Sequence, residues 1–244
     1  MSITHTTVAD GTFSTAGATD YNAAHTVTAP LTLAAGGTGT AALEFTSQTL
    51  ETVPDAGDAE YDGKALYFTP QGAERGVIEV AQTMVLSSDF GLSAALGVQR
   101  CLPGTAGQVA LSSATTYLME GQYILNTGAT THTTALAFAA GGSLAVGSLE
   151  YFSQLWSAAA NTIATASSTT HVSGVASKVI NATSTAVYTL IYFSGVLRVT
   201  TGGTIIPQIN FSANPTGTNL MKAGSYIKFA PIGSNTAQTI GNWS

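Results

Sequence analysis

Few side chains in this sequence are spaced for catalysis. The four histidines are His5, His25, His132 and His171. Each lies among Thr, Ser and Ala, and neither H-E-x-x-H nor G-x-S-x-G occurs, whereas a general base needs a partner at hydrogen-bond distance. After residue 100 the only acids are Glu120 and Glu150, so this part of the chain could supply at most one carboxylate pair for glycoside cleavage. We therefore expect no enzyme activity and no catalytic residue.

One acidic cluster could in principle bind a cation. Its members are Asp55, Asp58, Glu60 and Asp62, of which the last three alternate onto one face of a strand. Calcium takes several oxygen ligands, but the spacing does not match an EF-hand loop. We favour a solvated hairpin edge that resists sheet-to-sheet aggregation, while contact with a basic patch on a neighbouring protein stays open. We predict no cofactor and no metal ligand, and the sequence leaves open whether this cluster binds a cation.

Aromatic and sulfur side chains allow a second set of interpretations. Tyr151, Phe152 and Trp156 lie in one strand-like run and could line a sugar-binding surface, but we favour packing in a core or an interface. Cys101 is the only cysteine, so no intrachain disulfide can form. We interpret it as a small buried hydrophobic residue.

The composition indicates an all-β protein that is poor in charge. Asp, Glu, Lys and Arg make up 8% of the 244 residues and the net charge is −6, against about a quarter charged in ordinary soluble domains. The 26 glycines, with abundant Thr and Ala, favour strands and tight turns over long helices. No basic patch for nucleic acid, membrane-length apolar run or secretion signal occurs. We expect synthesis in a host cytoplasm, with neither nucleic acid nor membrane as a partner.

Charge and composition divide the chain. Residues 1–100 contain eleven acids and three bases, whereas residues 101–244 contain two acids and four bases. Residues 1–42 have the composition of an extended arm, with too few large apolar residues to offset their own ordering entropy. We expect this arm to lie on a partner and to attach the protein to a particle. The candidate attachment residues are Phe13, Tyr21, Leu31 and Leu33.

Two regions follow the arm. Residues 43–80 indicate a small β-hairpin module, because Asp62-Gly63 readily takes the positive φ of a tight turn. From residue 81 to residue 244, strand-like runs alternate with turn residues, and we expect a jelly-roll sandwich. The strands expected here are 84–87, 95–102, 107–111, 116–125, 133–138, 143–156, 171–180, 186–199, 204–211 and 225–232.

One of these strands is apolar on both faces. Residues 187–193 read V-Y-T-L-I-Y-F, whereas a strand in a two-layer sandwich normally faces water on one side. We expect another copy of the chain to cover the second face; the alternative cover is a loop of the same chain. The candidate trimer-interface residues are Tyr188, Leu190, Ile191, Tyr192, Phe193 and, near the end of the chain, Trp243.

Several segments resemble structural proteins of tailed bacteriophages. The resemblance is clearest over residues 43–50 (LEFTSQTL) and 53–69 (VPDAGDAEYDGKALYFT). Residues 116–121 (TYLMEG), 224–233 (GSYIKFAPIG) and 241–244 (GNWS) are similar to the same group. The strand pattern between them is similar to the trimeric jelly roll of the tumour-necrosis-factor-like class. The resemblance implies a position on a virion, as a homotrimer.

The expected protein is thus all-β, with an N-terminal arm (1–42), a hairpin module (43–80) and a trimeric jelly-roll domain (81–244). The expected function is that of a capsid decoration or minor head protein, which binds the major capsid protein or another virion protein through its N-terminal region. The main alternative is a short tail fibre or fibre adaptor that binds a host glycan or another fibre protein. A cellular adhesin or surface-layer protein is a further alternative, which the absence of an export signal disfavours.

Overall fold

The structure is a computed structural model that describes residues 35–39, 41–72, 74–94, 96–104, 107–158, 166–184, 187–236 and 240. The chain divides into two compact units, Met1–Glu44 and Phe45–Ser244. Most of the first unit falls outside the described residues, as do Trp243 and the four candidate attachment residues, Phe13, Tyr21, Leu31 and Leu33. Within the described residues every regular element is a strand, so the protein is all-β, as its composition predicts.

The strands vary in length from three to fourteen residues. They are β1 (Ala59–Tyr61), β2 (Leu66–Phe68), β3 (Gly76–Ile78), β4 (Gln82–Val85), β5 (Phe90–Leu92), β6 (Gly97–Arg100), β7 (Val109–Leu111), β8 (Thr115–Asn126), β9 (His132–Gly141), β10 (Ala145–Ala158), β11 (Ala166–Ser173), β12 (Lys178–Ser184), β13 (Tyr188–Thr201), β14 (Gly203–Phe211), β15 (Asn219–Met221) and β16 (Tyr226–Ser234).

The first three strands form a small antiparallel sheet of their own, in the order β1-β2-β3. β1 and β2 form the hairpin expected at Asp62-Gly63, where Gly63 has a φ of +86°, which glycine adopts without steric penalty. The Oδ1 atom of Asp62 accepts hydrogen bonds from the N–H groups of Lys64 and Ala65, each at 2.8 Å. The turn residues thus stabilise the register of the hairpin.

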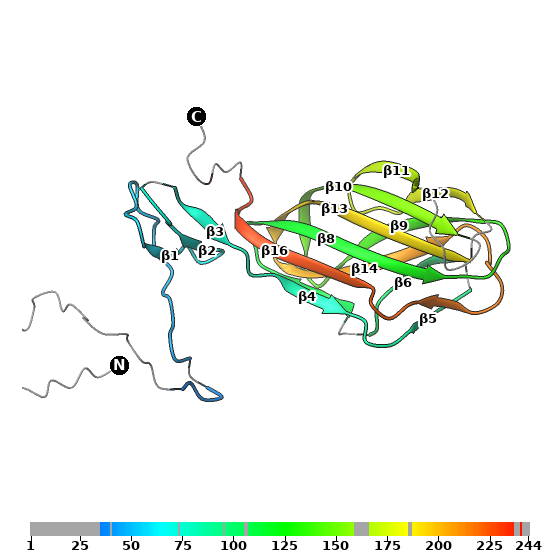
Figure 1. Ribbon diagram of the computed structural model, residues 1–244, viewed down its shortest axis with the longest axis horizontal. Helices are drawn as coiled ribbons and strands as arrows, with labels where there is room; N and C mark the ends of the chain where they lie inside the picture. The colour runs from blue at the N-terminus through cyan, green and yellow to red at the C-terminus, as the bar shows by residue number, and fades with distance from the viewer. Residues whose placement is uncertain are drawn as a thin grey trace, which may run out of the picture. The chain divides into compact units, whose positions relative to one another are not determined.

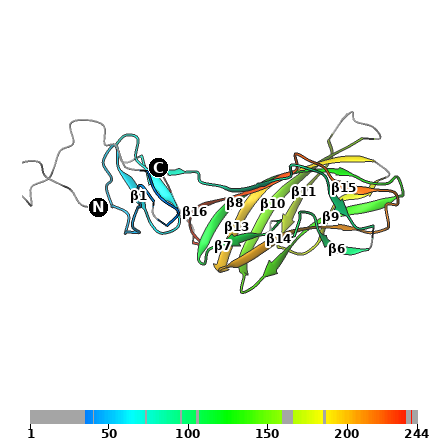
Figure 2. The same ribbon diagram turned by 90° about the horizontal axis from the view of Figure 1, so that it is seen from below.

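The other strands form two antiparallel sheets that pack face to face across one hydrophobic core (Figures 1 and 2). The larger sheet has the order β11-β10-β13-β8-β15-β5; β16 also pairs with β8, and β4 pairs with β16. The smaller sheet has the order β12-β9-β14-β6, and β7 pairs with the other end of β14. The chain therefore crosses between the sheets at β5–β6, β7–β8, β8–β9, β9–β10, β11–β12, β12–β13, β13–β14 and β14–β15.

Alternation along the long strands builds this core. In β8, Tyr117, Met119 and Tyr123 are buried, whereas Glu120 and Gln122 lie on the other face and are partly exposed, as the period of two in a strand predicts. In β14 the buried residues are Ile205, Pro207, Ile209 and Phe211. The alternation in the sequence therefore matches the side of these strands that faces the core.

Some strand predictions are wrong. The single strand predicted over residues 171–180 is two strands, because β11 ends at Ser173 and β12 begins at Lys178, with Gly174 at a φ of +89° after β11. These two strands belong to different sheets. β3, β5 and β15 are not predicted, since three residues are too few for alternation to be visible. The other expected strands each overlap an observed one.

Candidate interaction surface

The strand β13 lies in the middle of the larger sheet, between β10 and β8. Ile191 and Phe193 point into the core and are fully buried. Tyr188, Leu190 and Tyr192 alternate with them on the opposite face, which we call the outer face, and are half-buried. The strand is therefore apolar on both faces, but only one of these faces contributes to the core.

Two of the candidate interface residues belong to the core. Ile191 and Phe193 expose no side-chain surface, so they cannot contact a partner of the folded chain. Phe193 packs edge-to-face against Tyr123, with ring centroids 4.9 Å apart. The sequence could not show which alternate set faces inward, because both sets are apolar. The candidates that lie on the outer face are Tyr188, Leu190 and Tyr192.

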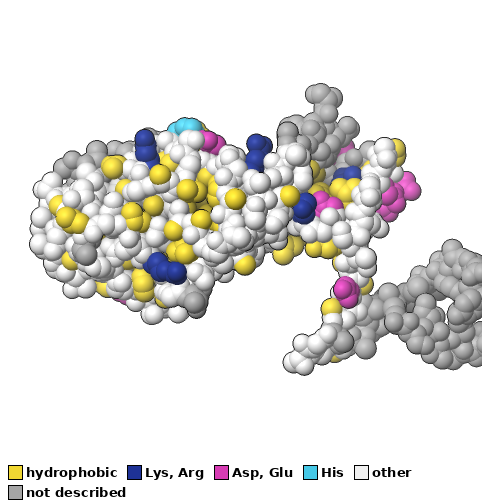
Figure 3. Space-filling view, turned by 180° about the vertical axis from the view of Figure 1, so that it is seen from behind, with side chains coloured by type: hydrophobic (Ala, Val, Ile, Leu, Met, Phe, Trp, Pro, Cys, Tyr) yellow, Lys and Arg dark blue, Asp and Glu magenta, His cyan; other side chains and the backbone are white. Residues whose placement is uncertain are grey.

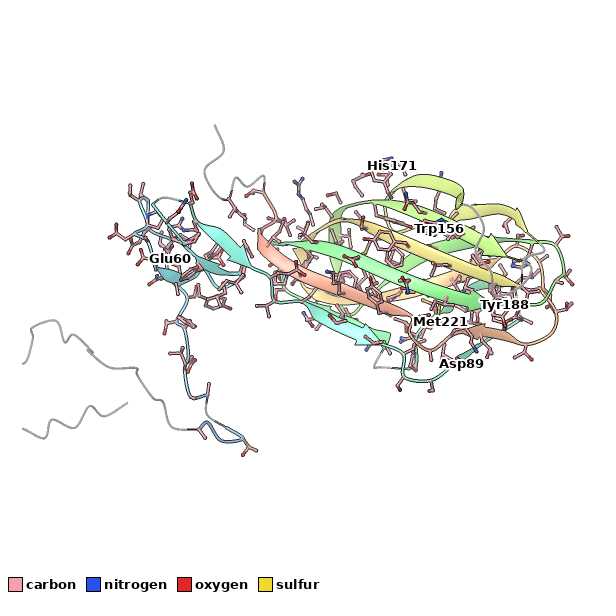
Figure 4. All side chains as sticks on the ribbon, in the orientation of Figure 1. Glu60, Asp89, Trp156, His171, Tyr188 and Met221 are labelled. Carbon is pink, nitrogen blue, oxygen red and sulfur yellow. The ribbon has the colours of Figure 1, made fainter. Side chains whose placement is uncertain are left out.

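Neighbouring strands extend the outer face. Leu190 lies opposite Trp156 of β10 and Ile124 of β8, and Val196 lies opposite Leu118. Figure 4 labels Trp156 and Tyr188 on this sheet. The outer-face side chains of the three central strands are Glu150, Phe152, Gln154 and Trp156 on β10, Tyr188, Leu190, Tyr192, Ser194, Val196 and Arg198 on β13, and Leu118, Glu120, Gln122 and Ile124 on β8. A continuous surface with so many large apolar side chains is typical of an association site.

A shallow hollow of about 310 Å³ lies in this face, where β8, β13 and β16 run side by side with β8 in the middle. Ser194 and Gly195 of β13 line it and leave room, because their side chains are small or absent. Its apolar wall consists of Leu118, Val196 and Ala230, and its charged wall of Glu79, Glu120 and Lys228. The hollow could therefore receive a side chain from a partner without burying an unpaired charge.

The charged side chains of this hollow form ion pairs with one another. The Nζ atom of Lys228 lies 3.2 Å from Oε2 of Glu120 and 3.3 Å from Oε1 of Glu79, and the Tyr226 hydroxyl donates to Oε1 of Glu120 at 2.6 Å. The hydrogen bond from Tyr226, helped by Lys228, lowers the pKa of Glu120. The same bond raises the pKa of Tyr226 to about 12, and the two carboxylates raise the pKa of Lys228. Glu120 therefore stays ionised and partnered in the folded chain.

A second polar cluster lies where β10 pairs with β11. Oε2 of Glu150 is 2.9 Å from Nε2 of His171, and the Ser173 hydroxyl donates to Oε1 of Glu150 at 2.6 Å. The ring of Phe152 lies beside His171, with centroids 5.1 Å apart. Glu150 and Glu120 are on strands separated by β13, and the lowered pKa of Glu120 is the opposite of what a general acid needs. Glu120 therefore does not suit the role of a general acid.

The acidic cluster of residues 55–62 is used within the hairpin module. Glu60, which is labelled in Figure 4, is 3% exposed; its Oε2 lies 2.7 Å from Nε of Arg75, and its Oε1 accepts the N–H of Glu51. Asp58 accepts the N–H of Asp55. The prediction of a solvated hairpin edge is wrong for Glu60, because its partner Arg75 is fifteen residues away and no local pattern indicates the pairing. Among the described residues, no group of three or more His, Cys, Asp or Glu side chains could hold a metal ion.

The aromatic candidates separate into core and surface. Tyr151 is buried, with its ring centroid 5.7 Å from that of Phe138, whereas Phe152 is 59% exposed and Trp156 partly exposed on the outer face. His132 is buried against Phe211. Tyr151 therefore cannot line a sugar-binding surface, while Phe152 and Trp156 are accessible to a partner of any kind.

Neither a spanning helix nor a known relative explains this surface. In the part of the chain that the structure describes, no helix is long and apolar enough to cross a membrane. Charged side chains are sparse on the face shown in Figure 3, where hydrophobic side chains lie scattered among uncharged ones. No protein-family model, curated protein or solved structure matches the chain.

Proposed function

We propose that this protein is a structural component of a tailed-phage particle and assembles as a homotrimer through the outer face of its larger sheet. The observation that supports assembly is the outer face itself, which Tyr188, Leu190 and Tyr192 share with the exposed side chains of Leu118 and Phe152. Burial of apolar surface contributes roughly 25 cal/mol per Å². Interface cores are also enriched in aromatic residues and depleted in charge. A second copy of the chain is the partner that fits this composition best.

The strand order supports a jelly-roll fold for the two-sheet part of the chain. If β6 and β7 count as one interrupted strand, eight strands in chain order are β4, β6/β7, β8, β9, β12, β13, β14 and β16. One sheet then pairs the first, eighth, third and sixth of them, and the other pairs the second, seventh, fourth and fifth. This is the order of two interleaved Greek keys, as in a jelly roll. The hairpin β10–β11 widens the first sheet beyond β13.

The virion role rests on the phage resemblance of residues 43–69 and on the scarcity of charge. A particle protein functions by shape and contact area, so it needs no catalytic constellation. We propose that the N-terminal region attaches the trimer to the major capsid protein or another virion protein after synthesis in the host cytoplasm. Three attachment segments on one trimer raise one another's effective concentration, which favours a decoration or minor head protein.

The tail-fibre alternative has one observation in its favour. The exposed ring of Phe152 lies beside the polar cluster of Glu150, His171 and Ser173, and a sugar could stack on the ring and bond to the polar groups. Copy number per particle separates the two roles, since a decoration protein is present in many copies and a fibre in few. Quantitative gel staining of purified particles measures this number.

A matched pair of substitutions tests the outer-face interface. Leu118 on β8 and Val98 on β6 are similarly exposed, at 43% and 46%, but belong to different sheets. In Leu118→Asp, a trimer would bury an unpaired charge near Glu120, so we expect a folded monomer by light scattering and circular dichroism. Val98→Asp should remain trimeric. Two variants with the same mass as the wild type would refute the interface.

Truncation tests the attachment region separately. Removal of residues 1–42 should leave a trimer that no longer joins purified particles, because the two-sheet part of the chain carries the outer face and the removed part carries the proposed contact. Co-sedimentation with particles measures the binding. Undiminished binding by the truncated protein would place attachment in residues 43–244.

A further inference from the structure

The hairpin module presents its apolar side to solvent. Tyr61, Leu66, Phe68 and Ile78 share one face of the sheet β1-β2-β3, because Leu66 pairs with both Tyr61 and Ile78, and Phe68 follows two residues later on the same side. Phe68 and Ile78 are 41% and 42% exposed. We call this face, which has no charged residue, the module face.

The opposite face of the module is covered but has a polar interior. Glu60 and Tyr67 are buried there, at 3% exposure each. Glu60 is paired with Arg75, whose Nη2 atom also donates to the backbone oxygen of Glu51. A buried ion pair is weak support for stability. The module therefore has a small, polar core on one side and an uncovered apolar face on the other.

The module is small compared with an independently folding domain. Chains below about 40 residues are usually held by disulfides, metals or oligomerisation, and the module, residues 43–80, is no longer than that. It contains no cysteine, because the only one is Cys101, and the described residues contain no group that could hold a metal ion. Within the compact unit Phe45–Ser244, the module is stabilised by contacts with the two-sheet part, such as the hydrogen bond from Nζ of Lys64 to the backbone oxygen of Ser113 at 3.5 Å. Self-association would add a further stabilising contact on the uncovered face.

The module is also tied closely to the proposed interface. Only Glu79, Val80 and Ala81 separate β3 from β4, and a link of this length spans at most about 14 Å. Glu79 itself bonds to Lys228 on the outer face. Trimerisation through that face would therefore hold three modules at high effective concentration.

We infer that the module face is a second self-association site, at which the modules of three chains pack against one another through Tyr61, Leu66, Phe68 and Ile78. The inference rests on the proposed trimer and adds a second contact region to it. The absence of charge on the module face favours another copy of the same face over the charged surface of an unrelated protein.

Crosslinking through introduced cysteines tests this inference. Cys101 is fully buried and its pKa is raised to about 12 by burial, so an added cysteine would be the only reactive thiol in the full-length chain. Phe68→Cys and, independently, Ile78→Cys are treated with a short bis-maleimide. The control is Val53→Cys, which is 72% exposed and lies in the segment whose Glu51 contacts the opposite face.

We expect both module-face cysteines to give interchain crosslinks whose yield does not change on dilution, and Val53→Cys to give few. Light scattering on the same samples separates the two proposals. A trimeric mass with no more crosslinking from Phe68→Cys and Ile78→Cys than from Val53→Cys would overturn the module contact and leave the outer-face trimer intact. A monomeric wild-type protein would overturn the trimer itself.

Discussion

At the residue scale, Gly121 of β8 allows the ring of Phe193 to occupy the core. A Cβ atom at position 121 would lie 2.2 Å from Cζ of Phe193, a distance that no packing tolerates. We predict that Gly121→Ala lowers the free energy of unfolding by about 1–3 kcal/mol, the usual range for overpacking a core. Urea denaturation at a fixed protein concentration measures it.

The control for this substitution is Gly91→Ala, because a Cβ there would meet nothing within 4 Å. Its effect on the free energy of unfolding should be small. Adding Phe193→Leu to Gly121→Ala should cost less than the sum of the single changes, since the two positions share one space. Equal effects of Gly121→Ala and Gly91→Ala would contradict the packing described here.

The pairing of Glu120 with Tyr226 and Lys228 makes a prediction about pH. A carboxyl group whose pKa is lowered on folding stabilises the folded state fully above its unfolded pKa, near 4.5, and loses that contribution as the pH falls through the folded pKa. We therefore predict that the difference in free energy of unfolding between wild type and Glu120→Gln has its full size near neutral pH and becomes smaller below pH 4.5.

Urea denaturation from about pH 7 down to about pH 3 measures this difference. Glu44→Gln is the control, because Glu44 is exposed, and its difference from wild type should stay small throughout. A Glu120→Gln difference that grew on acidification would show that Glu120 is not stabilised in its ionised form.

At the element scale, the two faces of β13 respond differently to charge. Ile191→Asp would bury an unpaired carboxylate in the core, at a cost of several kcal/mol, and should unfold the chain. Tyr192→Asp places the same charge on the outer face and should give a folded monomer. Circular dichroism and light scattering distinguish these outcomes. A trimeric Tyr192→Asp protein would exclude this part of the outer face from the interface.

Alternation made most of the long strands predictable. β8 and β14 carry their charged and amide side chains on one face only, so their inward sides follow from the sequence. Alternation does not identify the inward side of β13, because both faces of this strand are apolar. Only its pairing with neighbouring strands shows that Phe193 points inward and Tyr192 outward. The outer face as a unit was also beyond prediction, since it depends on the register of β8, β10 and β13.

Short-range patterns predicted turns better than pairings. Asp62-Gly63 predicted the hairpin of β1 and β2, because the turn chemistry is local. The ion pair of Glu60 could not be predicted, because its partner Arg75 approaches it only when β3 folds back against β2. The crossing between β11 and β12 was missed for a similar reason, since a change of sheet leaves little trace in composition.

At the scale of the whole molecule, the scarcity of charge and the exposure of apolar surface both favour self-association. With 8% charged residues, the chain has few ions with which to surround its apolar faces. The outer face and the module face both expose apolar side chains, and exposed apolar surface favours contact with another protein over water. Self-association accounts for both faces with a single partner, which is why we place the trimer at the centre of the account.

The mass of the full-length protein in solution tests this central claim most directly. One chain has a mass of 24.7 kDa, and a closed three-fold assembly would have three times that, about 74 kDa. We predict that light scattering coupled to size-exclusion chromatography gives the trimer mass across the accessible concentration range. A stable species of one-chain mass would contradict the account.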